Sequence, residues 1–248
     1  DPWKHNTWRR RHNVAWNLSK NHRVLFVEPP LTVFQPFRET QLNWRHLLNL
    51  GRFKYQGRNL YSYFPVRLFP LSFPGSKRFN YYEIDKQRTF NTLNKIVKKL
   101  EFKNPILWIF PDNYQYHYYG LFNEKIVVVD WYDDFFAPTS QQVDVKSLNQ
   151  TRKKLSVMLK KADIMFTPSF EMKDILAKYR KDVRVISHGV DTNLYKDSNE
   201  SFHPIASLEK VGKPILCYLG TMITKIDFEL LMYMATNNPN WTLLLIGK

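Results

Sequence analysis

The chain has 248 residues, of which 44% are hydrophobic and 16% aromatic, with only 8 glycines, and this composition excludes a disordered or low-complexity protein. Its 37 Lys and Arg against 22 Asp and Glu give a net charge of +15, which predicts acidic partners: nucleic acid, anionic lipid or phosphorylated substrates. The single cysteine, Cys217, excludes an intrachain disulfide and favours a reducing compartment, and no apolar run reaches the roughly 20 residues of a membrane span.

The first part of the chain predicts helices that alternate with buried strands. In chain order these are a helix over 10–21, a strand over 22–30, a single strand over 57–65 in the Pro- and Arg-rich stretch 31–78, a helix over 82–100, a strand over 105–110, a short helix over 113–122 and a strand over 125–131. The helix over 82–100 places one apolar stripe toward a core, made of Ile84, Phe90, Leu93, Val97 and Leu100.

The same alternation continues to residue 187 and restarts near the end of the chain. We predict a helix over 147–162, a strand over 163–168, a helix over 169–179 with Ser169 as its N-cap, a strand over 182–187, and then a strand over 214–219, a helix over 226–237 and a strand over 241–246. Helices and strands in alternation with short loops are typical of a parallel sheet covered on both faces. The sequence therefore predicts an α/β fold with one domain over 1–195, a polar linker over 196–213 and the start of a second domain over 214–248.

Common catalytic signatures are missing, so the candidate residues come from the carboxyl ends of predicted strands, where open α/β sheets bind ligands. The chain has no G-x-G-x-x-G, no Walker A loop, no H-E-x-x-H, no C-x-x-C and no G-x-S-x-G. Asp130, Asp133 and Asp134 end one strand, and such carboxylates bind a sugar hydroxyl, bind a metal or act as a base. A loop capped by its own carboxylates explains the same residues.

Three further segments are candidates on the same reasoning. Asp112 and His117 follow a strand among tyrosines, which suits a carbohydrate site or a crowded surface loop. His188 stands next to Gly189 in "ISHGVD", where it could reach across a cleft or belong to a turn that ends the domain. In "GKPILCYLGTMITKIDFELL" the turn at Gly220 would point the N–H groups of Thr221 and Met222 toward a phosphate, with Lys225 adding charge; a plain glycine turn is the alternative.

Taken in order, several segments resemble those of GT-B glycosyltransferases, specifically the retaining, family-four-like group that builds bacterial surface polysaccharides or teichuronic-acid-type polymers. The segments are "PWKHNTWRRRHNVAWNLSKNHRVLFVEPP", "PILWIFPD", "VVVDWYDDF", "ADIMFTPSFEMKDIL", "VRVISHGVDTNLY", "PILCYLGTMITKIDFELL" and "NWTLLLIGK". Each motif is loose by itself, but the series in this order is specific. The resemblance implies two Rossmann-like domains, an acceptor bound mainly by the first domain and a nucleotide-diphosphate sugar bound mainly by the second.

The resemblance also assigns residues. It implies that Gly220 and Thr221 face the donor diphosphate, with Lys225 near the family's basic position, and that Arg10 is the arginine of the N-terminal loop that contacts acceptor or phosphate. Among the residues at the predicted strand ends, Asp112, Asp133 and His188 are expected to line the acceptor side. The catalytic residue is not identified, with Asp130 and His117 as the candidates that the strand ends offer. His188 departs from the usual Asn of the family's "NGVD", and the sequence departs from the "GR…KG" pattern near Lys225. No cofactor or metal is implied, since the nucleotide sugar is a substrate.

The family's first strand and its glutamate motif have no counterpart here, so we expect the 248 residues to form part of a longer chain and to transfer no sugar by themselves. The predicted partners are a nucleotide sugar, a saccharide or lipid-linked acceptor and an anionic membrane surface, with a cytoplasmic location peripheral to the inner face of the membrane. Two alternatives stay open. One is a catalytically inactive GT-B-like partner, and the other is a basic α/β protein that binds nucleic acid, although no nucleic-acid module is present.

Overall fold

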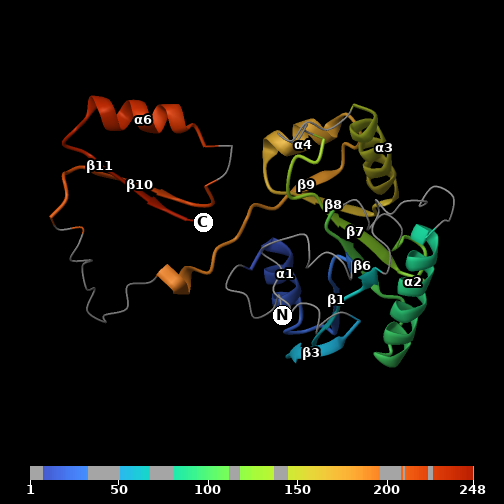
Figure 1. The fold of residues 1–248 in the computed structure, drawn as a ribbon. Coiled ribbons are helices and arrows are strands. Elements are labelled where there is room, and N and C mark those ends of the chain that lie inside the picture. The colour runs from blue at the N-terminus through green and yellow to red at the C-terminus, as the bar shows by residue number, and fades with distance from the viewer. Residues whose placement is uncertain are drawn as a thin grey trace. The chain divides into compact units, whose positions relative to one another are not determined.

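A computed structural model describes residues 8–32, 51–67, 81–111, 118–136, 145–195, 208, 210–222 and 226–247 (Figure 1). The described residues belong to two compact units, the first ending at Gly189 and the second beginning at Val190. Both units are α/β. Most of the predicted linker, 196–207 and 209, lies outside the described residues.

The largest sheet of unit 1 is a four-stranded parallel sheet, as the alternating pattern predicted. Its order is β6 (Ile106–Ile109), β7 (Ile126–Asp130), β8 (Ile164–Thr167) and β9 (Val183–Val185). The run "IVVVD" forms β7, where Val129 and Asp130 are fully buried, because a parallel strand with neighbours on both sides is covered on both faces. Helix α3 (Val145–Lys161) contributes Leu155, Met158 and Leu159 to the same core.

Helix α4 (Phe170–Ala177) begins where the sequence predicted. Ser169 is its N-cap, and its Oγ accepts a hydrogen bond from the Met172 N–H at 3.2 Å. This bond satisfies one of the N–H groups that the first turn of a helix leaves without an intrahelical acceptor.

A second sheet of unit 1 departs from the prediction of a single strand between residues 31 and 78. Strand β4 (Leu60–Tyr63) pairs in parallel with β1 (Val24–Val27) and antiparallel with β3 (Phe53–Gly57). The predicted strand over 57–65 therefore starts too early. Arg58 and Asn59 form the turn that joins β3 to β4, with φ of 105° at Gly57 and 53° at Arg58. This turn carries no Asn-Gly signal that would have revealed a hairpin. The short strands β2 (Leu31–Thr32) and β5 (Val66–Arg67) also pair in parallel.

Two further helices cover unit 1. Helix α1 (Arg10–Leu18) packs Ala15 against Phe26 of β1, and α2 (Tyr81–Lys99) packs its later turns against Tyr63. The predicted stripe of α2 was wrong at one position. Ile84 is 56% exposed, whereas Ile96, which the prediction omitted, is 7% exposed and belongs to the core. The helix contacts the core through its second half, so a residue in its first turn is left outside.

Unit 2 contains the predicted strand, helix and strand, and begins with a 3₁₀ turn (Thr192–Tyr195). Strands β10 (Ile215–Leu219) and β11 (Thr242–Ile246) pair in parallel, and α6 (Phe228–Asn237) connects them. Large apolar side chains stay exposed on all three elements: Leu219 is 77% exposed, Met232 67% and Tyr233 66%. Within the described residues, this βαβ unit leaves apolar faces uncovered.

Candidate functional site

An ion pair links the start of α1 to the carboxyl end of β7. Arg10 Nε lies 3.0 Å from both carboxylate oxygens of Asp130, and Arg10 Nη1 donates to the Ser187 carbonyl at 3.1 Å. The side chains of Arg10 and Asp130 are 12% and 0% exposed. One guanidinium therefore ties three segments together, α1, β7 and the loop after β9, at the carboxyl edge of the sheet.

The pKa of the Asp130 carboxyl depends on its burial and on its neighbours. Burial raises the pKa of Asp130, while the Arg10 hydrogen bond and charge, the nearby His188 and the Trp108 indole each oppose that rise. A buried carboxylate needs such partners, because removing a charge from water is otherwise expensive. Both carboxylate oxygens of Asp130 accept a hydrogen bond from Arg10 Nε, so the main role of Asp130 in this site is to orient the Arg10 guanidinium.

The structure brings together three residues that the sequence nominated separately. Arg10, Asp130 and His188 meet at the carboxyl edge of the sheet, although they come from α1, the end of β7 and the loop after β9. His188 is exposed, whereas Asp130 is covered. The arrangement presents a cationic guanidinium and an accessible imidazole at the edge where parallel sheets bind their ligands.

Asp133 makes a hydrogen bond within its own loop. Its Oδ1 accepts a hydrogen bond from the Asp134 N–H at 2.8 Å, and Asp134 Oδ1 accepts one from the Phe136 N–H at 3.0 Å. Both carboxylates therefore stabilise the turn that follows β7, which is the loop-capping alternative that the sequence left open. Asp112, His117 and Lys225 lie outside the described residues.

The turn after β10 uses its backbone groups within unit 2. The Gly220 N–H donates to the Ile246 carbonyl at 2.9 Å, and the Thr221 carbonyl accepts from the Tyr218 hydroxyl at 3.1 Å. The following helix is capped by Asp227, which accepts from the Leu230 N–H at 2.8 Å. The structure leaves the donor-binding roles of Gly220 and Thr221 as predictions, and it adds an acidic side chain at the helix start.

Sequence reasoning missed two residues near the site. The indole of Trp108 in β6 lies close enough to Asp130 to lower its pKa. Thr167 ends β8 fully buried, with no hydrogen-bond partner for its hydroxyl among the described residues. Both residues lie in predicted strands, and their position at or near the carboxyl end of a strand is the feature that could have indicated a role in the site. An isolated Trp or Thr in an apolar run otherwise looks like core.

Neither a metal site nor a membrane span is found in the described part of the chain, and comparisons with family models and curated proteins give no match. Among the described residues, no three His, Cys, Asp or Glu side chains are arranged to hold a metal ion. The helices described there include none with the length and apolarity needed to cross a bilayer. No family model matches the chain, and a search of curated proteins finds no match.

Proposed function

We propose that the chain is the acceptor-side part of a glycosyltransferase that moves a sugar from a nucleotide-diphosphate sugar to a saccharide or lipid-linked acceptor. The observation that carries the proposal is the meeting of Arg10, Asp130 and His188 at the carboxyl edge of a parallel sheet. The ordered motifs that resemble the family support it, and they include the segments that hold these three residues.

The geometry suggests how the residues would act. Asp130 and the Ser187 carbonyl hold the Arg10 guanidinium in one orientation, and Arg10 Nη2 makes no hydrogen bond to another described residue. A guanidinium fixed in this way binds a phosphate or sugar oxygen without losing side-chain entropy. Because a departing diphosphate gains negative charge, a pre-oriented cation near it would lower the barrier of the transfer.

The test is a transfer assay on the protein with its natural flanking sequence and on the 248-residue chain in parallel. A panel of radiolabelled nucleotide sugars is incubated with membrane lipid extract, and label in the lipid and polymer fractions is counted. We expect label from one donor only, and none with the 248-residue chain alone. Binding of no nucleotide sugar by the protein with its flanks would contradict the proposal.

A pair of histidine variants locates the activity. His188→Ala removes an exposed side chain at the carboxyl edge of the sheet, and we expect it to lower the turnover at least tenfold. His22→Ala, also exposed but next to the start of β1, is the matched control and should leave the turnover unchanged. Equal rates for both variants would remove His188 from the proposed site.

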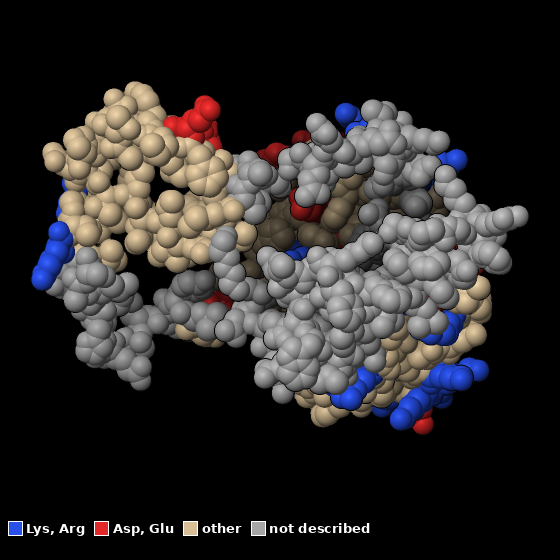
Figure 2. All heavy atoms as spheres, viewed as in Figure 1, with Lys and Arg blue, Asp and Glu red and all other residues tan. Residues whose placement is uncertain are grey.

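The net charge supports an anionic membrane as the place of the acceptor. Exposed lysines gather where α2 ends, at Lys95 and Lys98, and Figure 2 shows basic side chains at this end of unit 1. Each basic residue near an anionic bilayer adds about 1 kcal/mol of attraction. We expect Lys95→Glu with Lys98→Glu to weaken sedimentation with phosphatidylglycerol vesicles more than Lys153→Glu with Lys160→Glu on α3. Binding that ignores lipid charge and salt would contradict a membrane role.

A further inference from the structure

The connections that lead into the strands of unit 1 carry exposed basic side chains. They are Lys20 and Arg23 before β1, Arg58 before β4, Lys98 and Lys99 at the end of α2, Lys103 before β6 and Lys125 before β7. Among the described residues of these connections, the exposed acid is Glu101. This set is the basic edge of unit 1, and its positive charge is nearly uncompensated.

Hydrogen bonds join the first connections of the basic edge side by side. The Val24 N–H donates to the Asn59 carbonyl, so the start of β1 lies next to the turn that holds Arg58. Arg23 Nη1 donates to the Leu100 carbonyl, which places the connection before β1 beside the end of α2. Residues far apart in the sequence therefore form one surface.

The connections before β6 and β7 extend this surface. The Lys125 N–H donates to the Pro105 carbonyl at 3.0 Å, and the Asn123 side-chain amide donates to the Asn104 side-chain oxygen at 2.7 Å. The loops that hold Lys103 and Lys125 are therefore neighbours. Figure 2 shows basic side chains gathered at the end of unit 1 where α2 stops.

The basic edge lies opposite the edge that holds the Arg10–Asp130 pair. Asp130 is the last residue of β7 and Lys125 precedes its first, so five strand residues, about 16 Å, separate them. Helix α1 begins beside Asp130 and ends next to the connection before β1. At the carboxyl edge exposed charges of both signs occur, such as those of Arg9 and Asp133. An anionic surface is therefore attracted to the basic edge more than to the edge that holds the site.

Most cations of the basic edge are lysines, and both of its arginines are already engaged. Arg23 donates to the Leu100 carbonyl, and the Arg58 guanidinium lies over the Trp16 ring at 4.2 Å. Lysine ammonium groups are point charges that attract an anionic bilayer, whereas nucleic-acid binding relies on the planar fork of arginine and on aromatic side chains that stack on bases. The basic edge therefore fits a lipid surface better than a nucleic acid.

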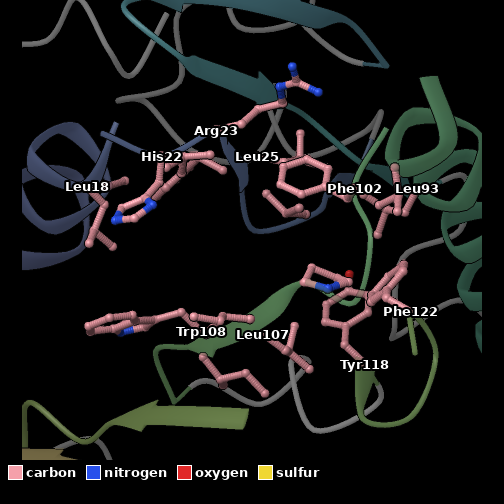
Figure 3. A pocket seen from close by; sticks show the side chains of 18 of the residues that line it. Leu18, His22, Arg23, Leu25, Leu93, Phe102, Leu107, Trp108, Tyr118 and Phe122 are labelled. Atoms are coloured by element: carbon pink, nitrogen blue, oxygen red, sulfur yellow. The ribbon is translucent and has the colours of Figure 1, made fainter. Parts of the chain in front are cut away.

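An apolar cavity borders the basic edge and favours the same partner. The cavity has a volume of about 550 Å³ and lies between β1 and β6, and Figure 3 shows Leu18 and Leu25 facing Leu107 across it. Arg23 and Lys103 of the basic edge also line it. Apolar side chains next to cations suit a lipid, which offers acyl chains beside an anionic headgroup, whereas a nucleic acid has no acyl chain.

We propose that the basic edge docks unit 1 on an anionic bilayer, so that the Arg10–Asp130 site faces away from the membrane and takes lipid-linked acceptors whose glycan is already several sugars long. Acceptor length matters only if unit 1 serves the proposed glycosyl transfer, on which this inference rests. In that reaction an acceptor hydroxyl forms the new glycosidic bond and loses its proton, while the nucleotide diphosphate leaves with the electrons of the broken bond. Earlier sugar transfers must supply such an acceptor, so the reaction extends a polymer and does not place the first sugar on the lipid.

The span between the two edges sets the acceptor length. The first half of α2 lies near the carboxyl end of β4, where Arg88 Nη2 donates to the Val66 carbonyl at 2.9 Å, and the helix ends at Lys99 on the basic edge. Its 19 residues are about 28 Å long. A sugar attached directly to a lipid headgroup lies at the bilayer surface and does not reach across this span, whereas the far end of a longer glycan does.

Lysine acetylation locates the docking surface without relying on activity. The protein with its natural flanking sequence is acetylated with and without phosphatidylglycerol vesicles, and mass spectrometry gives the rate at each lysine. We expect the acetylation of Lys98, Lys103 and Lys125 to slow at least fivefold. Lys86 and Lys173, which lie near the starts of α2 and α4, should react at an unchanged rate. Protection of Lys86 and Lys173 instead, or of no lysine, would overturn the docking.

Charge reversal tests the same surface in a second way. Lys98→Glu with Lys103→Glu should weaken sedimentation with phosphatidylglycerol vesicles at least tenfold, whereas Lys86→Glu with Lys173→Glu is the matched control and should bind like the parent. Equal binding by the two variants would contradict the proposal. If a single-stranded oligonucleotide at the same phosphate concentration protects the lysines of the basic edge and vesicles do not, the surface binds nucleic acid and the proposal is wrong.

Acceptor length is tested in the transfer assay. The membrane lipid extract is separated by glycan length, each fraction is built into phosphatidylglycerol vesicles, and the saccharide released from the shortest fraction is tested free in solution. We expect label on the long anchored glycans and on the free short saccharide, and at least tenfold less on the short anchored glycan. Equal transfer to short and long anchored acceptors would overturn the inference and leave the proposed function standing. Transfer to no acceptor would remove the proposed function, and with it the acceptor length.

Discussion

Arg10 and Asp130 form the contact on which the carboxyl edge of the sheet depends. Both side chains are nearly buried, and each charge offsets the free-energy cost of burying the other. Replacing Arg10 with Ala leaves the Asp130 charge buried and unpaired, so we expect the free energy of unfolding to fall by about 3–5 kcal/mol. Urea denaturation measures the change.

Controls for this prediction come from a second pair and a double variant. Lys86→Ala breaks the exposed bond of Lys86 to Glu83 on α2, and it should cost only about 0.2–0.5 kcal/mol. Arg10→Ala with Asp130→Ala should lose less than the sum of the two single changes, because the second removes the stranded charge. An Arg10→Ala variant as stable as the parent would show that the ion pair contributes nothing.

Glu28, which follows β1, and His12 of α1 contribute to stability with opposite dependence on pH. Burial raises the pKa of Glu28 from 4.5 to about 7, against the charge of Arg11, so its contribution to stability is full below pH 4.5 and is lost as the pH rises to 7. Burial, together with Arg11 and Arg9, lowers the pKa of His12 from 6.5 to about 4, so its contribution is full above pH 6.5 and is lost toward pH 4.

The two effects cancel in part between these limits, and a single variant separates them. Between pH 4.5 and 7 the ionisation of Glu28 lowers the parent's free energy of unfolding by about 3 kcal/mol, and Glu28→Gln removes this decrease. We therefore expect the variant's unfolding free energy to rise with pH over this range, driven by His12, whereas the parent's changes little. Urea titrations at several pH values give both curves, and parallel curves for the two proteins would refute the role assigned to Glu28.

At the scale of elements, caps and turns decide where helices and strands begin. Ser169 holds the first turn of α4 through its bond to the Met172 N–H. Ser169→Ala should cost about 1 kcal/mol of unfolding free energy, since an N-cap serine is worth about 0.5–2 kcal/mol. Ser156→Ala is the matched control within α3, where the hydroxyl donates to the Lys153 carbonyl; this change should be neutral or slightly stabilising. Equal losses for both would mean that the cap carries no special weight.

At the scale of the whole molecule, the two units differ in how well their sheets are covered. Strand β7 has neighbours on both sides and nearly no exposed side chains, whereas β10 and β11 form a two-stranded sheet with half-exposed apolar residues. Sheets of two strands are marginally stable alone. We expect the amides of β10 and β11 to exchange with solvent at least tenfold faster than those of β7 in the intact chain. Equal protection in mass-spectrometric exchange would show that unit 2 is as well packed as unit 1.

The predictions from sequence succeeded where one segment's own pattern carries the signal. The apolar runs at β6, β7, β8 and β10 were found because each strand is a short β-branched or apolar stretch between polar turns. Strand β3 was missed because "FKYQG" is half buried and the turn after it lacks an Asn-Gly signature. The strand ends also placed Asp130 and His188 at one edge of a sheet, but they did not say which side chains would touch.

Local periodicity and turn residues act over a few positions, so the amino-acid sequence was sufficient to predict the α/β class, the elements of the four-stranded sheet and of unit 2 in chain order, and the residues at their strand ends. Only the tertiary structure decided that Arg10 binds Asp130 across 120 residues of chain, that Asp133 turns back to its own loop, and that β1 and β6 border a cavity. Those outcomes depend on how separate elements pack, and a contact between distant residues leaves no periodic mark on either segment.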